Sequence, residues 1–115
     1  MKFAISFLVV ILTALSLRAE PSTDSGNFLL PRCRDGLIPS NNTFLAGACF
    51  GTIEAIIKFE RLFPPGVKAC PPTGITRVQA VQAVIKYLDN HPADLDKEFA
   101  GLAMDALRDA WPCPK

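Results

Sequence analysis

The sequence predicts an all-α fold, a small disulfide-stapled bundle of about four helices. Apolar residues recur at helical spacing along three long segments, and no segment alternates apolar and polar residues over the length of a strand. Four cysteines follow an N-terminus typical of exported proteins, so we expect an oxidising compartment and two disulfide bonds. The 115 residues therefore divide into a signal peptide, residues 1–19, and a single helical domain, residues 20–115.

The first residues have the order and composition of a secretory signal peptide. Lys2 supplies the positive charge, an apolar run covers residues 3–17, and a short polar segment follows. The run is too short for a membrane span, which needs roughly 20 apolar residues. We expect cleavage after Ala19, with cleavage after Ser16 as the second choice. An uncleaved membrane anchor is the alternative.

Cleavage would leave a domain close to electrical neutrality. Because Lys2 and Arg18 are lost, the Lys+Arg count falls from 12 to 10 against 11 Asp+Glu, and the net charge becomes −1. Such a domain has no strong field to attract nucleic acid or an anionic membrane. We therefore expect no nucleic-acid partner and no membrane attachment after signal cleavage.

The first part of the domain has weak structural signals. Residues 21–27 are polar, and Phe28–Leu30 could begin a short helix, but Pro31 argues against a long one. Residues 34–42 contain several turn-forming dipeptides and predict a loop. Asn41 begins a glycosylation sequon, which matters only in a cell that glycosylates exported proteins.

A central helix is predicted over Thr43–Phe63. Apolar residues occupy most of its circumference, so we expect it to be largely buried. Gly47, Gly51 and Ala55 recur every four residues and form a flat strip along which another helix could approach closely. Glycine in a helix costs about 1 kcal/mol relative to alanine, so the strip needs a packing reason. We expect close packing within the domain, with a dimer seam as the alternative.

A proline-rich connector, Phe63–Ile75, follows the central helix. Its prolines and Cys70 should keep it stiff, and a stiff exposed loop loses little entropy when it binds a partner. We expect Lys68 to be exposed at its tip. A plain interhelix linker is the alternative interpretation. The candidate partner-binding residues of this loop are Pro65, Gly66, Lys68, Pro71 and Pro72.

The next helix is predicted over Arg77–Asp89. Thr76 and Gln79 have the spacing of a capping box at its start, and His91-Pro92 ends it. Its buried face is expected to hold Val78, Val81, Val84, Ile85 and Leu88.

The last helix is predicted from about Lys97 to Trp111. Asp94 or Asp96 is expected to cap its start. Pro112 cannot continue a helix and therefore marks its end.

Four cysteines can pair in three ways. Two antiparallel helices of similar length would bring Cys70, before the first, next to Cys113, after the second. That leaves Cys33 to bond to Cys49. By the loop-closure model these two bonds contribute about 4 and about 3 kcal/mol. A metal site or a redox pair is the weaker alternative, since no Cys-x-x-Cys motif is present.

No group of residues in the chain has the pattern of an active site. The single histidine, His91, stands at a helix end, where a capping or turn role is expected, and it cannot complete a zinc site with the cysteines. No phosphate-binding loop, zinc-protease motif or calcium loop is present. We therefore predict a binding protein without catalytic residues, metal or cofactor. Tyr87, His91 and Asp94 are secondary candidates for partner contact.

Four short motifs of the chain form a recognisable set. They are Cys49-x-Gly51-x-Ile53, Gly74-Ile75-Thr76, Lys86-Tyr87-Leu88-x-x-His91-Pro92 and Ala110-Trp111-Pro112-Cys113-Pro114. The set resembles the signature of the Tai/Rap family of type VI secretion immunity proteins, and the resemblance covers residues 33–114. The chain departs from the family pattern at Thr52, where tyrosine is usual, and at Lys58, where aspartate is common.

The resemblance implies a small, helical, disulfide-bonded protein of the periplasm. Known members bind and block peptidoglycan amidase effectors, and an immunity loop enters the amidase cleft, often from a homodimer. The expected partner is therefore a secreted amidase-type effector, and a homodimer is a further candidate assembly. The matching motifs are structural, so no contact residue carries over. The Phe63–Ile75 connector is our first candidate for the blocking loop, and the His91–Asp96 turn is the second.

Other classes of function remain open. A small acid-stress chaperone of the periplasm would be a dimer that opens at low pH, with a carboxylate trigger such as Glu54, Asp94, Asp96 or Asp105. A family member without a toxin partner would have an unknown binding role. An enzyme or a lipid carrier would need a ligand-filled cavity between the helices. An amidase in the neighbouring reading frame would favour the immunity function.

Overall fold

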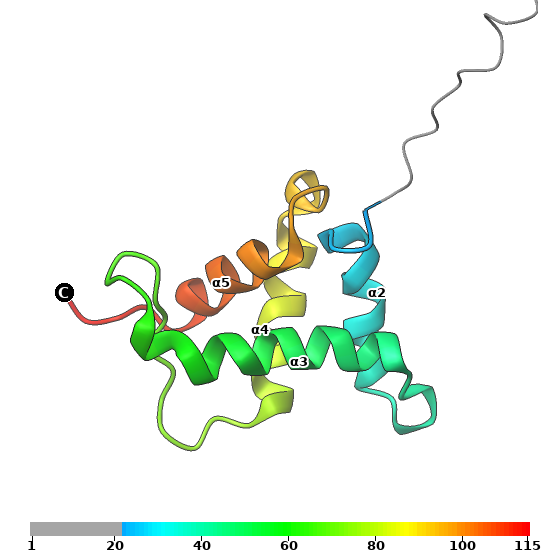
Figure 1. The fold of residues 1–115 in the computed structure, drawn as a ribbon, viewed down its shortest axis with the longest axis horizontal. Helices are drawn as coiled ribbons and strands as arrows, with labels where there is room; N and C mark the ends of the chain where they lie inside the picture. The colour runs from blue at the N-terminus through cyan, green and yellow to red at the C-terminus, as the bar shows by residue number, and fades with distance from the viewer. Residues whose placement is uncertain (1–21) are drawn as a thin grey trace, which may run out of the picture.

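The computed structural model describes residues 22–115, and four α-helices make up the fold of this part of the chain (Figure 1). The helices are α2 (Gly26–Gly36), α3 (Phe44–Phe59), α4 (Arg77–Asn90) and α5 (Phe99–Ala110). Short 3-10 helices lie at Pro39–Asn41 (η2), Glu60–Leu62 (η3) and Pro92–Asp94 (η4). The predicted all-α fold is confirmed. The predicted signal peptide, residues 1–19, lies outside the described residues.

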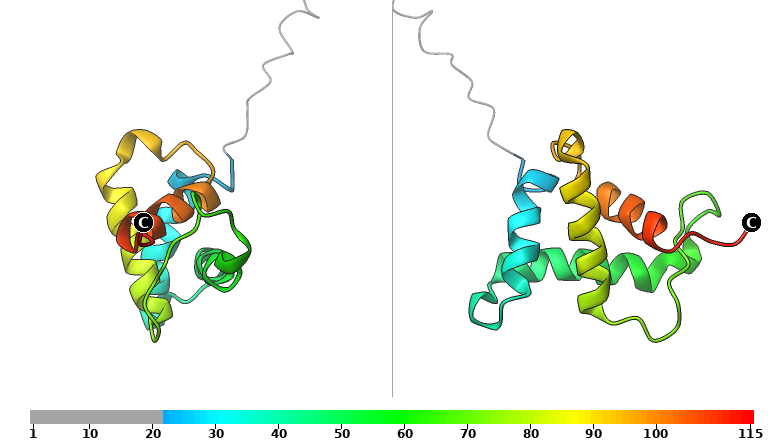
Figure 2. Two further views of the ribbon diagram at one scale, coloured as in Figure 1. Left: turned by 90° about the vertical axis from the view of Figure 1, so that its left-hand side faces the viewer. Right: turned by 180° about the vertical axis from the view of Figure 1, so that it is seen from behind.

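The four helices cross one another around one core. In Figure 1, α2 and α4 stand upright and run in opposite directions, whereas α3 and α5 run across them. The side view in Figure 2 accordingly shows α3 and α5 end-on. Each helix contributes apolar side chains where it faces the others. The largest contributions to the core come from Leu29, Leu30, Cys33, Cys49, Ile53, Val81, Val84, Leu88, Phe99, Leu102 and Leu107.

The last two helices do not form the antiparallel pair that we predicted. α5 runs across α4 instead of back along it (Figures 1 and 2). The Cys70–Cys113 bond is nevertheless present, with a Cα–Cα distance of 4.9 Å, because the segment between Cys70 and α4 spans the gap between the helix ends. Beside the bond, the backbone N–H of Cys70 donates to the carbonyl oxygen of Trp111 over 2.8 Å.

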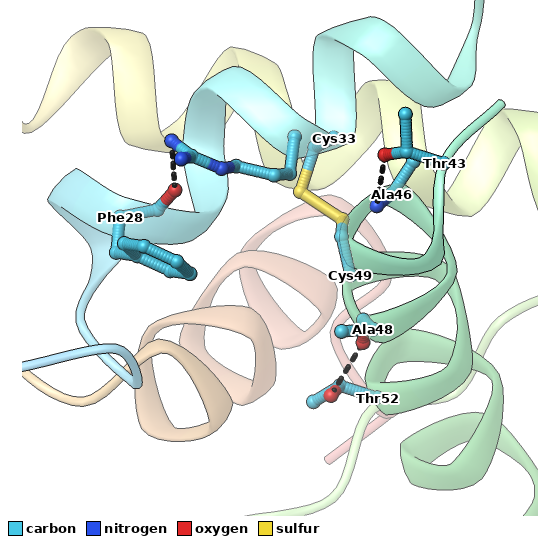
Figure 3. The surroundings of a disulfide bond; sticks show 8 residues. Phe28, Cys33, Thr43, Ala46, Ala48, Cys49 and Thr52 are labelled. Atoms are coloured by element: carbon cyan, nitrogen blue, oxygen red, sulfur yellow. Dashed lines mark hydrogen bonds between the residues drawn. A yellow bond between two sulfur atoms is a disulfide. The ribbon is translucent and has the colours of Figure 1, made fainter. Parts of the chain in front are cut away.

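The second predicted bond, Cys33–Cys49, joins α2 to α3 (Figure 3). Both cysteines are fully buried, and their Cα atoms lie 5.4 Å apart. Close to the bond, Thr43 caps α3, because its hydroxyl oxygen accepts the backbone N–H of Ala46 over 3.2 Å. The bond and the cap together fix where α3 begins against α2.

α2 is longer than predicted. The helix has 11 residues and continues through Pro31, which is exposed. The carbonyl oxygens of Lys97 and Leu95 accept the first two backbone N–H groups of the helix over 3.0 and 2.7 Å, and the Ser25 hydroxyl oxygen accepts the third. These bonds stabilise the start of the helix from a distant part of the chain. The helix therefore tolerates the loss of one backbone hydrogen bond at Pro31, which has no N–H to donate.

α3 is far less buried than predicted. Its fully enclosed residues are Ala46, Cys49 and Ile53. By contrast, Phe44 is 90% exposed and Phe59 is 56% exposed. Leu62, just beyond the end of the helix, is 77% exposed. A Cβ atom added at Gly47 or Gly51 would meet nothing within 4 Å. The strip of small residues on α3 therefore has no partner within residues 22–115, and the expected close packing inside the domain is wrong.

The connection from α4 to α5 also differs from the prediction. Neither Asp94 nor Asp96 caps α5, whose N-cap is Glu98 and has no side-chain bond. Instead, the carbonyl oxygen of Asp24 accepts the backbone N–H of Phe99 over 2.7 Å, next to an isolated antiparallel bridge between Ser25 and Glu98. The start of the domain thus supplies the cap of its last helix.

α4 begins at the capping box that the sequence predicts. The Thr76 hydroxyl oxygen accepts the backbone N–H of Gln79 over 3.1 Å, and the Gln79 side chain accepts the backbone N–H of Thr76 over 2.9 Å. The buried face is rotated from the predicted one, because Val78 is 47% exposed and Ala80 is enclosed. The buried apolar side chains of α4 pack against α2, α3 and α5.

Candidate functional site

The Phe63–Ile75 connector forms two turns, one before Cys70 and one after it. In the first turn, the backbone N–H groups of Val67 and Lys68 donate to the Pro64 carbonyl oxygen over 3.0 and 3.2 Å. The tip of this turn, at Pro65 and Gly66, is exposed. Lys68 is only partly exposed, so it does not stand at the tip as we expected.

A guanidinium group from α5 ties down the first turn. Arg108 donates from one nitrogen to the Gly66 carbonyl oxygen over 2.9 Å and from another to the Asp105 carboxylate over 2.8 Å. Sequence reasoning missed this contact, because the two residues are 42 positions apart and no local pattern connects them. The contact restrains the tip of the loop relative to the last helix.

The second turn lies between Cys70 and α4. The backbone N–H of Ile75 donates to the Pro72 carbonyl oxygen over 3.3 Å, and Gly74 takes a positive φ of 89°. Glycine adopts this backbone conformation without the steric cost that a side chain would impose. Between the two turns, Ala69 is buried and Cys70 is bonded to Cys113. The connector is therefore anchored at its middle and closed by a turn on each side.

The candidate residues of the connector fall into two surface hollows. Pro65, Gly66 and Lys68 line one hollow of about 680 Å³ together with both cysteines of the Cys70–Cys113 bond. Pro72 lines a second hollow of about 390 Å³, which Trp111 also borders. Pro71 is partly exposed between them. The structure thus presents the connector as two neighbouring surfaces on either side of the disulfide.

Tyr87 and His91 lie together near the end of α4, on the side that faces α5. Their rings stack with centroids 3.9 Å apart, and His91 Nδ1 lies 2.7 Å from the Tyr87 carbonyl oxygen, so this nitrogen acts as the donor. Burial raises the pKa of Tyr87, and the carboxylates of Asp105 and Asp109 raise it further. The pair borders a hollow of about 440 Å³ between α4 and α5.

The backbone N–H of Asp94, the third secondary candidate, donates to the His91 carbonyl oxygen over 3.1 Å, but its side chain has a different partner. Its carboxylate is 2.7 Å from the Lys97 ammonium group, and the hydrogen bond from Lys97 lowers the pKa of Asp94. Asp94 does not line the hollow of Tyr87 and His91. The structure therefore joins two of the three secondary candidates and assigns the third to a turn-stabilising ion pair.

Within residues 22–115, His, Cys, Asp and Glu side chains form no group of three or more that could hold a metal ion. The four cysteines of this region are all in disulfides. No helix of the same region has the length and the apolar character needed to cross a bilayer. What the surface offers is a stiff, exposed loop bordered by shallow hollows, an arrangement suited to contact with another macromolecule.

Comparison with protein-family models identifies the family of the chain. A family model described as Rap1a immunity proteins matches residues 25–113. The match spans the four helices, both disulfides and the whole connector. Comparisons with curated proteins and with solved structures each found no match.

Proposed function

The chain belongs to the family of Rap1a immunity proteins, and on this premise we propose that it binds a secreted effector and blocks it. The effector that we propose is a peptidoglycan amidase delivered by a type VI secretion system. The place of action is the periplasm, which agrees with the signal-peptide composition of residues 1–19 and with the two disulfide bonds. The family match is the observation that carries the proposal.

The proposed blocking element is the Phe63–Ile75 connector. An inhibitor that occludes a cleft gains affinity when its inserted loop is already ordered, because binding then costs less conformational entropy. The Cys70–Cys113 bond and the Arg108 hydrogen bond to Gly66 both restrict the connector before any partner arrives. Pro65 and Gly66 form the part that enters the cleft. Lys68, Pro71 and Pro72 contact its rim.

This function requires binding and no catalysis by the chain itself. The Tyr87 and His91 pair is the second contact surface that we propose, since it borders a hollow that no connector residue lines. The two surfaces can be separated experimentally, because each has a lysine of its own that can be changed: Lys68 in the connector and Lys86 at the second hollow.

The experiment needs a candidate amidase effector, which is sought first in the reading frames beside that of this chain. Purified amidase is assayed on peptidoglycan with increasing amounts of the chain, and the inhibition constant is compared between wild type and variants. We expect the Lys68→Glu and Pro72→Ala double variant to weaken inhibition at least tenfold, and Lys86→Glu to change it less. Full inhibition by the double variant would reject the connector as the blocking element. Lack of inhibition by the folded wild-type protein would reject the amidase as its target.

We also propose that two copies of the chain pair through the exposed side of α3. Phe44, Phe59 and Leu62 stand at its two ends, with Gly47 and Gly51 between them. The exposed apolar side chains present on the order of 500 Å² per copy, so a symmetric pair would bury roughly 1,000 Å², the lower limit for a specific interface.

The distribution of these residues suits an antiparallel pair with its two-fold axis at Gly51. Such a pair places Gly47 against Ala55 of the second copy, where the helices approach closely. It also brings Phe44 near Phe59 of the second copy, an aromatic pair. A two-fold interface requires a surface that complements itself, and this one does.

Sedimentation measurements over a range of concentrations test this pairing. We expect wild type to dimerise reversibly at micromolar concentration and Gly51→Leu to be monomeric, because leucine would separate the helices. Gly101→Leu is the matched control, since Gly101 is also a helical glycine with open surroundings but lies on α5. A wild type that stays monomeric at high concentration would reject the pairing.

A further inference from the structure

A small pocket lies where α3 meets the start of α4, away from the connector tip and from Tyr87. Its floor and walls are apolar and come from Ile53, Ile57, Ile75 and Ala80, of which Ile53 and Ala80 are fully buried. The pocket volume is about 190 Å³. An apolar cavity of about 150 Å³ accommodates a benzene-sized molecule, so this pocket has room for a branched group of a few carbons.

Three charged side chains stand at the mouth of this pocket. The carboxylate of Glu54 lies 3.0 Å from the Lys58 ammonium group and 2.8 Å from the Arg77 guanidinium group. The hydrogen bond from Lys58, with the charge of Arg77, lowers the pKa of Glu54, so this carboxylate is ionised at neutral pH. Two positive charges thus share one negative charge, and the mouth carries one positive charge in excess.

Both cations retain donors for an additional ligand. An ammonium group has three N–H donors and a guanidinium group has five. Within residues 22–115, each of the two cations forms its one ion pair with Glu54. Lys58 and Arg77 are both more than half exposed, so a ligand can reach them from solvent.

From this geometry we propose that the pocket binds a short branched aliphatic carboxylate. The ligand carboxylate pairs with Lys58 and Arg77 and neutralises their excess positive charge. The ligand's aliphatic group fills the space above Ile53 and Ala80. A long fatty acid exceeds the volume, and a phosphate would leave the apolar floor uncovered. The same chemistry is found in a free branched acid and in the carboxy-terminal valine, leucine or isoleucine of a peptide.

This binding site goes beyond the proposed immunity function and does not depend on it. Ile75, the last residue of the connector, lines the pocket, so a bound ligand would contact the base of that loop. Glu54 competes with the ligand for both cations. The proposal therefore predicts that removal of the Glu54 charge strengthens ligand binding.

The test is an NMR titration of the folded chain with isovalerate and with N-acetyl-leucine. We expect saturable shifts of backbone amides in residues 53–58 and 75–80, with a dissociation constant on the order of 1 mM for so small a ligand. N-acetyl-leucinamide, which lacks the charge, should bind about fivefold more weakly, the effect of one exposed ion pair. Acetate, which lacks the branched group, should bind at least about tenfold more weakly, because it buries three fewer carbons. Equal binding of the amide would overturn the proposal.

Three variants sharpen the result. Arg77→Gln should weaken binding of both acids about fivefold, whereas Glu54→Gln should tighten it and leave the amide unaffected. Lys86→Gln removes a cation from the same helix outside the pocket and should change nothing. Binding of both acids would identify a peptide terminus as an eligible ligand, and binding of isovalerate alone would identify a free acid. Failure of Glu54→Gln to tighten binding, with the fold intact by circular dichroism, would overturn the proposal.

Discussion

At the scale of single residues, glycines with opposite surroundings explain much of the packing. Gly26 is buried at the start of α2, where an added Cβ atom would lie 2.7 Å from a Leu102 methyl carbon and 3.1 Å from the Leu95 carbonyl oxygen. Gly47 on α3 has open space in the same position. Gly26 is therefore required, because Leu102 and Leu95 leave no space for a side chain. Gly47 weakens its helix, and no neighbour within the domain requires a glycine there.

This contrast predicts opposite effects of the same substitution. Gly26→Ala should lower the free energy of unfolding by about 1–3 kcal/mol, because the Leu95 backbone cannot move away without breaking its hydrogen bond to α2. Gly47→Ala should raise it by about 1 kcal/mol, because alanine favours the helix. Urea denaturation followed by circular dichroism measures both values at a concentration where the chain is monomeric. A loss of stability in Gly47→Ala would mean that its side of α3 is not open.

The residues that sequence reasoning placed correctly act through near neighbours. Thr76 and Gln79 form their capping box because both partners lie within one helical turn. Asp94 and Asp96 were assigned a capping role that Asp24 fulfils instead. A local pattern cannot reveal a cap that comes from a residue 75 positions away, and the position of Asp24 in a polar lead-in offers no signal of its own.

At the scale of elements, the turn between α4 and α5 couples an ion pair to acid stability. The Lys97 hydrogen bond lowers the pKa of Asp94 below the value of 3.8 for an unperturbed carboxyl group. A group with a depressed folded pKa contributes stability above its unfolded pKa and loses that contribution as the pH falls through the folded pKa. The contribution of Asp94 is therefore present at pH 5 and lost in the acid range below 3.8.

Asp94→Asn should consequently lower the unfolding temperature at pH 5 and make little difference near pH 2. Thermal unfolding at steps between these values measures the gap between variant and wild type. Asp96→Asn is the matched control, since Asp96 forms no ion pair among the described residues and should show no such convergence. A gap that stays constant with pH would show that Asp94 stabilises the turn by something other than its charge.

The same pKa direction bears on the acid-stress chaperone. Glu54 and Asp94 both have lowered pKa values, so each takes up its proton at a lower pH than an unperturbed carboxyl group. A domain opened by these two groups would respond only to stronger acid. Protection of a client protein from aggregation at low pH remains the measurement that distinguishes this function from effector blocking.

The accuracy with which each helix was predicted depends on how much of its stabilisation comes from residues nearby in the sequence. The ends of α4 and α5 were predicted to within a few residues, because a capping box and prolines mark them, although the buried face of α4 was misplaced. α2 was underestimated, since the bonds from Leu95 and Lys97 that stabilise it come from the other end of the domain. α3 was assigned to the interior because its sequence is apolar on every side, although the domain covers only one side of it.

At the scale of the whole molecule, the two disulfides differ in exposure. Cys33 and Cys49 are fully buried between α2 and α3, whereas Cys70 and Cys113 are partly exposed beside the connector. We expect a mild reductant without denaturant to open Cys70–Cys113 first, because the attacking thiolate must reach a sulfur atom. Alkylation followed by peptide mass analysis identifies the opened pair. Simultaneous reduction of both bonds would show that the domain unfolds before either is attacked.

Opening of Cys70–Cys113 should also affect effector binding, because that bond fixes the middle of the connector. The selectively reduced protein should inhibit the amidase more weakly while α2 and α3 stay joined. The sequence was sufficient to propose this loop from its prolines and Cys70. It could not show the Arg108 contact to Gly66, nor that Lys68 lies beside the tip, since both depend on how α5 crosses the domain.

The bridge between Ser25 and Glu98, with the hydrogen bonds around it, has a consequence for the order of folding. A chain that emerges N-terminus first can join Cys33 to Cys49 early, because only 16 positions separate them. The first turn of α2 must wait until residues 95–99 have emerged. Contacts between such distant segments form late and slow the overall reaction. The N-terminal part of the domain therefore stays incomplete until nearly all of the domain is present, which suits the export that we propose for this chain.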